Sequence, residues 1–159
     1  MNSRMTPSQS LASIRLERTF THRLHTLNKL SDKVTQSGYE SEAGIPAHEA
    51  RCLAAVGNYG ALSVNDLARE ANLDKGQASR AAQALVDKGL VLKASSATDG
   101  RGVVLTLTVQ GQRVWERTMR FIARRNLEIT ACLNDAEREQ LDALLDKLVQ
   151  HARHCVKAS

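Results

Sequence analysis

The sequence is poor in residue types on which several classes of protein depend. Its 159 residues include one Trp, two Tyr and two Phe, so it offers few of the aromatic platforms on which single-stranded nucleic acids stack. Its three cysteines, Cys52, Cys132 and Cys155, are too scattered for a disulfide framework and form no Cys-x-x-Cys pair or zinc-finger spacing. We expect all three to be small, buried, apolar side chains.

The chain also lacks the signatures of membrane proteins, secreted proteins and enzymes. No apolar run approaches the length of a membrane span, and the opening MNSRMTPSQS has no signal-peptide core, which favours a cytoplasmic protein. A phosphate-binding glycine loop, a metalloprotease helix and a nucleophile elbow are all missing. The sequence therefore predicts no enzyme, no catalytic residue, no bound metal and no cofactor.

The charge is positive but unevenly spread. The formal net charge is +5, which favours an anionic partner. Residues 1–30 hold five Lys or Arg and one acid, and residues 112–130 hold five and two, whereas residues 61–111 hold six and five. The excess lies outside the central segment, so charge alone does not mark that segment as DNA-binding.

One stretch of that central segment, DKGQASRAAQALVDKGL at 74–90, predicts a helix with a well-specified start and stop. Asp74 and Gln77 have the spacing of a capping box, and Gly89 is a natural stop. The polar stripe of this helix is rich in small hydrogen-bonding groups and poor in salt-bridge pairs, which is unusual for a plain surface helix. The stripe consists of Gly76, Ser79, Arg80, Gln83 and Asp87.

A second, shorter helix precedes it closely. Ser63 followed by Asp66 predicts a capped start, and Leu67, Ala68 and Ala71 are expected to face inward. Two short helices joined by so tight a turn form a helix-turn-helix.

After Gly89 the periodicity changes to that of strands. LVLKA (90–94) and GVVLTLT (102–108) are β-branched and apolar, and the SSATDGR between them has the composition of a hairpin turn. A helix-turn-helix followed directly by a two-stranded ribbon is a winged helix.

Long helices are predicted at both ends of the chain. The first spans about 10–36, followed by a loop at 37–44 and a helix at 46–58; the last two begin near residues 109 and 134. The first helix carries a stripe of apolar residues: Leu16, Phe20, Leu24, Leu27, Leu30 and Val34. Because the terminal helices hold more apolar surface than one small domain can cover, we expect a symmetric homodimer.

The expected fold class is mainly α with a small β-ribbon: a winged helix-turn-helix lobe plus amino- and carboxy-terminal dimerisation helices. Residues 1–9 are expected to form a flexible leader. Within 10–159, the dimerisation helices are 10–45 and 109–159, the connecting helix is 46–60, and the winged helix-turn-helix is 61–108.

The winged segment also carries an ordered set of motifs. They are Leu-Ala at 67–68, Ser-Arg at 79–80, L-x-x-K-G-L-V at 85–91, Asp-Gly-Arg at 99–101 and LTLTVQG at 105–111. In this order they resemble the core of the MarR (multiple-antibiotic-resistance regulator) family, so 10–159 is expected to be a single MarR-like domain. Two positions depart from the family pattern: Lys93 stands where arginine is common, and Gly102 follows the wing arginine where a charged or apolar residue is usual.

The resemblance implies a dimeric repressor that binds a pseudo-palindromic double-stranded DNA operator, with the helix at 74–88 in the major groove. Gln77, Ser79 and Gln83 are expected to contact bases, and Lys75 and Arg80 a guanine or a phosphate. Gly76 lets the backbone approach closely.

The resemblance also implies contacts outside this helix. Ser63 and Asn65 are expected to contact phosphates at the preceding helix start. Arg101 at the wing tip is expected to enter the minor groove, with Asp99 orienting it.

A small anionic effector, an aromatic carboxylate or a phenol, is a further implication of the resemblance, with DNA release as its default effect. We expect Arg18 and His22 of the first helix and His48 and Arg51 of the second to line its pocket. Arginine can clamp a carboxylate with two hydrogen bonds, and histidine can bind a ring substituent. The alternative is that these four are surface or interface charges.

Three other interpretations stay open. A thiol-redox switch would use Cys52 as its best candidate. A metal switch would use the i, i+3 histidine pairs His22 and His25, or His151 and His154 beside Cys155, but a convincing third ligand is missing. Finally, a winged helix can serve as a protein-interaction module without DNA binding.

Overall fold

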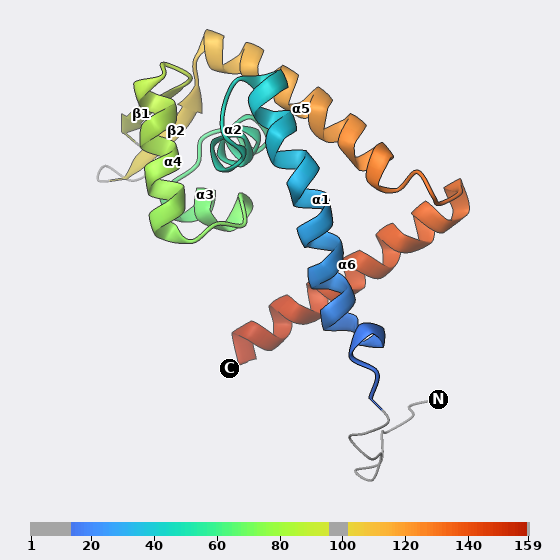
Figure 1. The fold of residues 1–159 in the computed structure, drawn as a ribbon. Coiled ribbons are helices and arrows are strands. Elements are labelled where there is room, and N and C mark those ends of the chain that lie inside the picture. Colours follow the sequence, from blue (N-terminus) through green and yellow to red (C-terminus); the bar gives the residue numbers. More distant parts are fainter. Residues whose placement is uncertain (1–13, 96–101, 159) are drawn as a thin grey trace. The chain divides into compact units, whose positions relative to one another are not determined.

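A computed structural model describes residues 14–95 and 102–158. A 3₁₀ turn, Leu16–Arg18, is followed by α1 (Phe20–Ala43), α2 (Ala47–Tyr59), α3 (Val64–Glu70), α4 (Lys75–Asp87), β1 (Val91–Ser95), β2 (Val103–Leu107), α5 (Val109–Ile129) and α6 (Asp135–Ala158) (Figure 1). The described residues form two compact units, which divide within α5 after Thr118. The mainly α fold with a small β-ribbon and a winged helix-turn-helix is confirmed. None of the described helices is both long and apolar enough to span a membrane.

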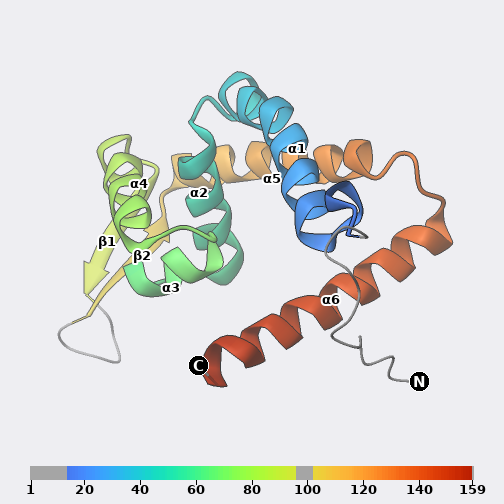
Figure 2. The ribbon, with the colours of Figure 1, turned by 60° about the horizontal axis from the view of Figure 1, so that its bottom comes forward.

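The core of the amino-terminal unit lies where α2, α3, α4 and the ribbon meet (Figure 2). Its largest fully buried side chains include Leu53 of α2, Leu67 of α3, Leu85 of α4 and Leu105 of β2. Each element contributes one leucine from its apolar side, so the core ties all four elements together. Burying a leucine side chain stabilises the fold by about 1.5–3 kcal/mol.

The helix-turn-helix is closed at its ends by the expected local contacts. The Ser63 hydroxyl accepts a hydrogen bond from the Asp66 amide at 3.1 Å. At α4, the Gln77 amide donates to Asp74 Oδ1 at 2.7 Å and the Asp74 amide donates to Gln77 Oε1 at 3.3 Å, so the predicted capping box is confirmed. Gly89 ends the segment with a φ of 69°, a left-handed conformation that favours glycine.

The ribbon is a two-stranded antiparallel sheet that runs beside α4 (Figure 2). The register pairs Val91 with Leu107 at one end and Ser95 with Val103 at the other. An additional bridge joins Leu105 to Leu62, just before α3. The predicted strands are thus confirmed to within one residue, while the turn between them lies outside the described residues, as does the predicted leader.

The first half of α5 packs closely on the winged lobe at two glycines. A Cβ placed on Gly57 of α2 would lie 2.2 Å from the Trp115 ring, and one placed on Gly111 would lie 1.8 Å from the Leu90 carbonyl oxygen. Trp115 Nε1 donates to the Ala54 carbonyl at 3.4 Å. Neither glycine leaves room for a side chain, so both fix α5 against its neighbours.

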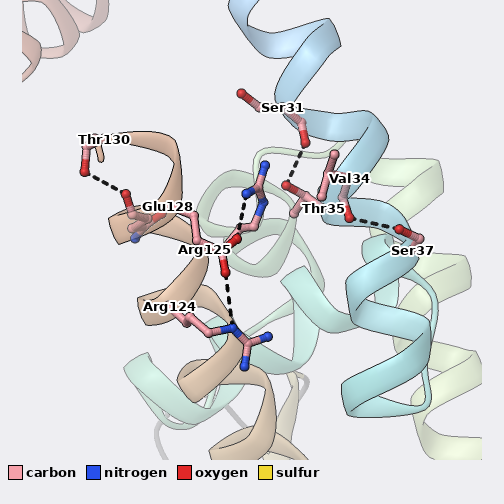
Figure 3. A network of polar contacts seen from close by, with 9 residues as sticks. Ser31, Val34, Thr35, Ser37, Arg124, Arg125, Glu128 and Thr130 are labelled. Carbon is pink, nitrogen blue, oxygen red and sulfur yellow. Dashed lines mark hydrogen bonds and ion pairs between the residues drawn. The ribbon is translucent and has the colours of Figure 1, made fainter. Parts of the chain in front are cut away.

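The prediction for the first helix was wrong at both of its ends. The described residues before Phe20 form no α-helix, and the expected loop at 37–44 continues as helix to Ala43, where Gly44 stops it with a φ of 74°. Packing explains the extension, because Tyr39 and Ala43 are buried. The Ser37 hydroxyl also donates back to the Val34 carbonyl at 3.0 Å (Figure 3).

In the single chain, the terminal helices expose apolar residues of the kind that the sequence analysis expects a dimer to bury. On α1 and the preceding turn, the exposed set comprises Leu16, Phe20, Leu24, Leu27, Leu30 and Val34, which we call the α1 apolar stripe. On α6, Leu144, Leu145, Leu148 and Val149 are exposed in the same way. Contiguous apolar surface of this kind is typical of an interaction surface.

The carboxy-terminal unit consists of the end of α5 and all of α6. Glu128 pairs with Arg125 at 2.8 Å and with Arg124 at 3.4 Å along α5 (Figure 3). Asn134 caps α6, since its Oδ1 accepts from the Glu137 amide at 2.9 Å and its own amide donates back to the Glu137 carboxylate. Asn134 therefore caps the start of α6, close to the predicted beginning of that helix.

Only one of the three cysteines follows the prediction. Cys52 is buried in α2, but Cys132 and Cys155 are exposed. The expectation of three buried side chains was wrong for these two because they lie near helix ends in the carboxy-terminal unit, where the single chain provides no cover.

Candidate functional site

The two faces of α4 differ sharply. Its buried face is made of Ala78, Ala81, Ala82 and Leu85, whose small side chains let the helix pack closely on α2 and α3. Its opposite face is exposed and carries the predicted DNA-contacting residues of this helix: Lys75, Gln77, Ser79, Arg80 and Gln83. The structure thus brings these five together on one open surface.

The first turn of that surface is shaped by Gly76. A Cβ placed on Gly76 would lie 3.3 Å from Arg80 Nη1 and 3.3 Å from Asp74 Oδ1. The Arg80 guanidinium therefore lies back over the first turn of α4, close to the capping carboxylate. This places its positive charge where the backbone is least covered by side chains.

Two predicted contact residues of this surface already have partners within the chain. Gln77 completes the capping box. Gln83 accepts from Lys93 Nζ at 2.6 Å and donates to Asp87 Oδ1 at 2.7 Å. Lys93, one of the two positions that depart from the MarR pattern, thereby links β1 to α4, and Asp87 is bonded to Gln83 within the helix.

The carboxylate of Asp66 lies at the start of α3. The Ser63 hydroxyl donates to Asp66 Oδ2 at 2.7 Å, and Arg69 Nη1 pairs with Asp66 Oδ1 at 2.9 Å. These contacts, that of Ser63 first, lower the pKa of the Asp66 carboxyl. Ser63 is half-buried by its capping role, whereas Asn65 beside it is exposed. The predicted wing residues Asp99 and Arg101 lie outside the described residues.

Helix α2 holds α4 at both ends through two polar contacts that the sequence analysis missed. Arg51 Nη2 donates to the carbonyl of Asn72, in the turn before α4, at 2.9 Å. Glu49 pairs with Lys88, directly after α4, at 2.5 Å, and the Glu49 side chain is only 7% exposed. The Lys88 side chain is 42% exposed, so solvent screens the pair, but the buried Glu49 carboxylate depends on Lys88 as its cationic partner.

The structure separates the four predicted effector residues. Arg51 lines a polar pocket of about 510 Å³ formed by α1, α2 and the helix-turn-helix turn, which we call the α1–α2 pocket. His22 lines a more open hollow of about 370 Å³ along α1. Arg18 and His48 are exposed and line neither.

The α1–α2 pocket contains opposite charges from two helices. Asp32 of α1 and Arg51 of α2 both line it, with the amides of Asn28 and Gln36 and the ring of Tyr39. Burial raises the pKa of Tyr39, while the Arg51 cation opposes that rise and the Asp32 carboxylate adds to it. Both charges thus act on the same buried hydroxyl. An Arg–Asp arrangement of this kind can bind a ligand with an anionic group and a hydrogen-bond donor.

The candidate redox and metal sites gain little from the structure. Burial raises the pKa of the Cys52 thiol to about 11, so very little of it is the reactive thiolate at neutral pH. Cys155 Sγ lies 3.6 Å from His151 Nε2 on α6. Within residues 14–95 and 102–158, no group of three or more His, Cys, Asp or Glu could hold a metal ion.

Comparisons with known proteins agree with this architecture. Residues 43–102, from the end of α1 to the start of β2, match the model of the MarR family. A MarR-family transcriptional regulator from Silicibacter pomeroyi superposes with a TM-score of 0.77 at 21% identity, covering 90% of this chain and 96% of its own. Over these residues the chain is similar to the MarR family, and its fold is that of the MarR-family structure.

Two further similar structures are of proteins described with small acids. BpsR of Bordetella bronchiseptica, described as regulated in DNA binding by 6-hydroxynicotinic acid, gives a TM-score of 0.76 at 22% identity, covering 86% of this chain and 96% of its own. A MarR-family protein of Mycobacterium tuberculosis in complex with salicylic acid gives 0.70 at 22%, covering 87% and 99%. No curated protein matches the chain in sequence.

Proposed function

We propose that the chain is a homodimeric repressor that binds a pseudo-palindromic duplex DNA operator and releases it on binding a small aromatic carboxylate. One observation carries the DNA-binding part. Helix α4 presents a continuous exposed face of small polar and basic residues, while its opposite face, made mostly of alanines, is buried against the rest of the lobe. A helix with such a face fits the major groove of duplex DNA. As the resemblance implies, Arg101 would enter the minor groove, with Asp99 orienting it.

Dimerisation is supported by the exposed α1 apolar stripe and the exposed leucines of α6. A second copy of the chain would cover such surfaces on both protomers alike, as symmetric dimers do. Two copies of α4 would then read two half-sites of one operator about one helical turn apart.

The effector part of the proposal is supported by the α1–α2 pocket and by the relatives named for 6-hydroxynicotinic acid and salicylic acid. Arg51 is the residue that would clamp the carboxylate. Arg18, His22 and His48 do not share this pocket in the single chain, so Arg51 is the effector residue to which we assign the main role.

The DNA-binding proposal is tested by fluorescence anisotropy with the duplex upstream of the protein's own gene, compared with a scrambled duplex. We expect tight, specific binding that weakens steeply with salt. Arg80→Ala should weaken specific binding about 10-fold or more, since one good arginine–base contact contributes about 1–3 kcal/mol.

Lys33→Ala is the charge-matched control, because Lys33 is exposed on α1, away from α4. It should leave the affinity unchanged. Equal affinity for the specific and scrambled duplexes, or for wild type and Arg80→Ala, would instead favour a winged helix that binds only proteins.

A further inference from the structure

Gln83 lies on the exposed face of α4, and its side-chain amide is held from two sides. Lys93 Nζ of β1 donates to Gln83 Oε1 at 2.6 Å, and Gln83 Nε2 donates to Asp87 Oδ1 at 2.7 Å. Asp87 lies one turn further along the same helix, and all three residues are exposed. These three side chains, which we call the Gln83 clamp, join the polar face of α4 to the ribbon.

The chemistry of the two partners determines which way the amide points. A lysine ammonium has only donors, and an aspartate carboxylate has only acceptors. An amide turned by half a rotation would place its NH₂ group against the Lys93 ammonium and its oxygen against the Asp87 carboxylate. Both contacts would then be repulsive. Gln83 is therefore held with its oxygen toward β1 and its nitrogen toward Asp87.

The clamp leaves the amide able to make two more hydrogen bonds. An amide oxygen has two lone pairs and an amide nitrogen has two hydrogens, and the clamp uses one of each. Gln83 thus offers one acceptor beside one donor. Their order along α4 is reversed only if both contacts of the clamp are broken.

Adenine is the base whose major-groove edge complements this pair, because it has a donor at N6 beside an acceptor at N7. Guanine has two acceptors at the same place, and thymine has an acceptor beside a methyl group. Cytosine has a donor alone. The amide oxygen of Gln83 would therefore face an acceptor on guanine and would gain only a single bond on cytosine.

We propose that Gln83 reads one adenine in each half-site of the operator, and that Lys93 is the residue that positions it for this contact. The inference rests on the proposed DNA-binding function, whereas the clamp itself can be tested without DNA. It goes beyond that function because it assigns one base to one side chain and gives a role in base selection to a residue of the ribbon.

Lys93 acts in this proposal through Gln83 and not as a phosphate contact. Phosphate contacts carry no sequence information, so their loss weakens binding to all duplexes alike. Loss of the positioning contact affects the choice of base at one position. Holding the glutamine before DNA arrives also lowers the entropic cost of binding, because a free glutamine side chain loses much rotamer freedom when it is fixed.

Anisotropy with base-substituted duplexes tests the reading of adenine. Each base pair of the operator half-site is replaced in turn by the other three, alike in both half-sites. Gln83→Ala should abolish the base preference at one position alone, which identifies the base that Gln83 contacts. There, wild type should prefer adenine about 10-fold or more, as a good two-bond contact provides. Gln83→Glu should instead prefer cytosine, since a carboxylate accepts from N4.

Substitutions of Lys93 test its positioning role at the same base pair. Lys93→Met leaves the amide free to turn and should reduce the adenine preference to about threefold or less, whereas Lys93→Arg still donates and should retain most of it. Lys75→Met is the charge-matched control, because Lys75 lies on the same face about two turns before Gln83. It should weaken binding to the four variants of this base pair equally.

Side-chain NMR of the DNA-free protein tests the clamp. The NH₂ group of Gln83 should relax as a rigid group in wild type and Lys93→Arg, and as a mobile one in Lys93→Met. The thermal midpoint of unfolding should stay the same in all three, because the clamp lies on the surface. A mobile NH₂ group in wild type would overturn the clamp.

The remaining outcomes separate this inference from the proposed function. Specific DNA binding in which the Gln83 position prefers a base other than adenine overturns the inference alone. The same holds if Lys93→Met weakens binding to all four bases equally, as the Lys75→Met control should. If no duplex is bound specifically, the proposed function fails and the reading of adenine fails with it, while NMR still decides the clamp.

Discussion

At Gly76 of α4, a substitution should affect the stability of the fold and the proposed DNA binding in opposite directions. Its exposed position in the first turn leaves a bare stretch of backbone, and only the mobile ends of the Arg80 and Asp74 side chains lie close to it. An added methyl group would displace neither backbone nor core. The cost of removing this glycine should therefore appear in binding and not in folding.

We predict that Gly76→Ala raises the free energy of unfolding by up to about 1 kcal/mol, because alanine favours the helix more than glycine does. The same methyl group stands on the face proposed to meet DNA, so operator affinity should fall about fivefold. Urea unfolding and anisotropy measure the two effects. Lower stability with unchanged affinity would show that the glycine serves the fold and not the DNA contact.

Residues with local roles were predictable from the sequence, and residues joined by long-range contacts were not. The Asp74–Gln77 box and the Gly89 stop depend on spacings of a few residues. By contrast, the Glu49–Lys88, Arg51–Asn72 and Gln83–Lys93 contacts join residues 39, 21 and 10 positions apart. No local pattern marks such pairs, because only the packing of α2, the turn and β1 around α4 brings them together.

At the scale of the element, α4 depends on the cap at its start. The Asp74 carboxylate satisfies the Gln77 amide, which has no partner within the helix. The residues that follow immediately, Lys75 and Gln77, belong to the proposed DNA-binding face. A frayed first turn would therefore disorder part of that face.

Asp74→Ala should lower the free energy of unfolding by about 1 kcal/mol and weaken operator binding, while Asp74→Ser, which can still cap, should retain most of both. Hydrogen exchange at the amides of residues 75–77 should accelerate. Asn134→Ala is the matched control, since Asn134 caps α6 through an equivalent pair of bonds with Glu137. Loss of DNA binding in that variant too would mean that general destabilisation, and not the cap of α4, is responsible.

Helices and strands were predicted well where local residue preferences and the burial pattern agreed, and poorly where they disagreed. The short helices and the strands have clear starts, stops and periods. The end of α1 has Ser37, Gly38 and Ser41, which individually favour a loop, but burial of Tyr39 and Ala43 keeps it helical. Tertiary packing overrides weak local preferences, and this packing could not be deduced from the sequence.

At the scale of the whole molecule, the α1 apolar stripe is an apolar surface that the single chain leaves exposed, as are the leucines of α6. Leu27, for example, is 57% exposed. Leu27→Glu should convert the proposed dimer to a monomer at micromolar concentration, because burying a charge against apolar side chains is strongly unfavourable. Sedimentation velocity measures the change.

Lys33→Glu is the control for this substitution, since Lys33 is exposed on the same helix but lies outside the stripe. It should sediment as wild type does. A wild-type protein that sediments as a monomer at all concentrations would exclude the dimer, and with it the reading of two half-sites by one molecule.

Trp115 is the only tryptophan in the chain, and its indole is fitted against Gly57 with its nitrogen bonded to the Ala54 carbonyl. Tryptophan fluorescence of the unlabelled protein therefore comes from one place, the contact of α5 with α2. Any rearrangement of α2, the helix that holds both ends of α4, should change the wavelength or intensity of that emission. The molecule thus contains its own optical probe where the start of α5 meets α2.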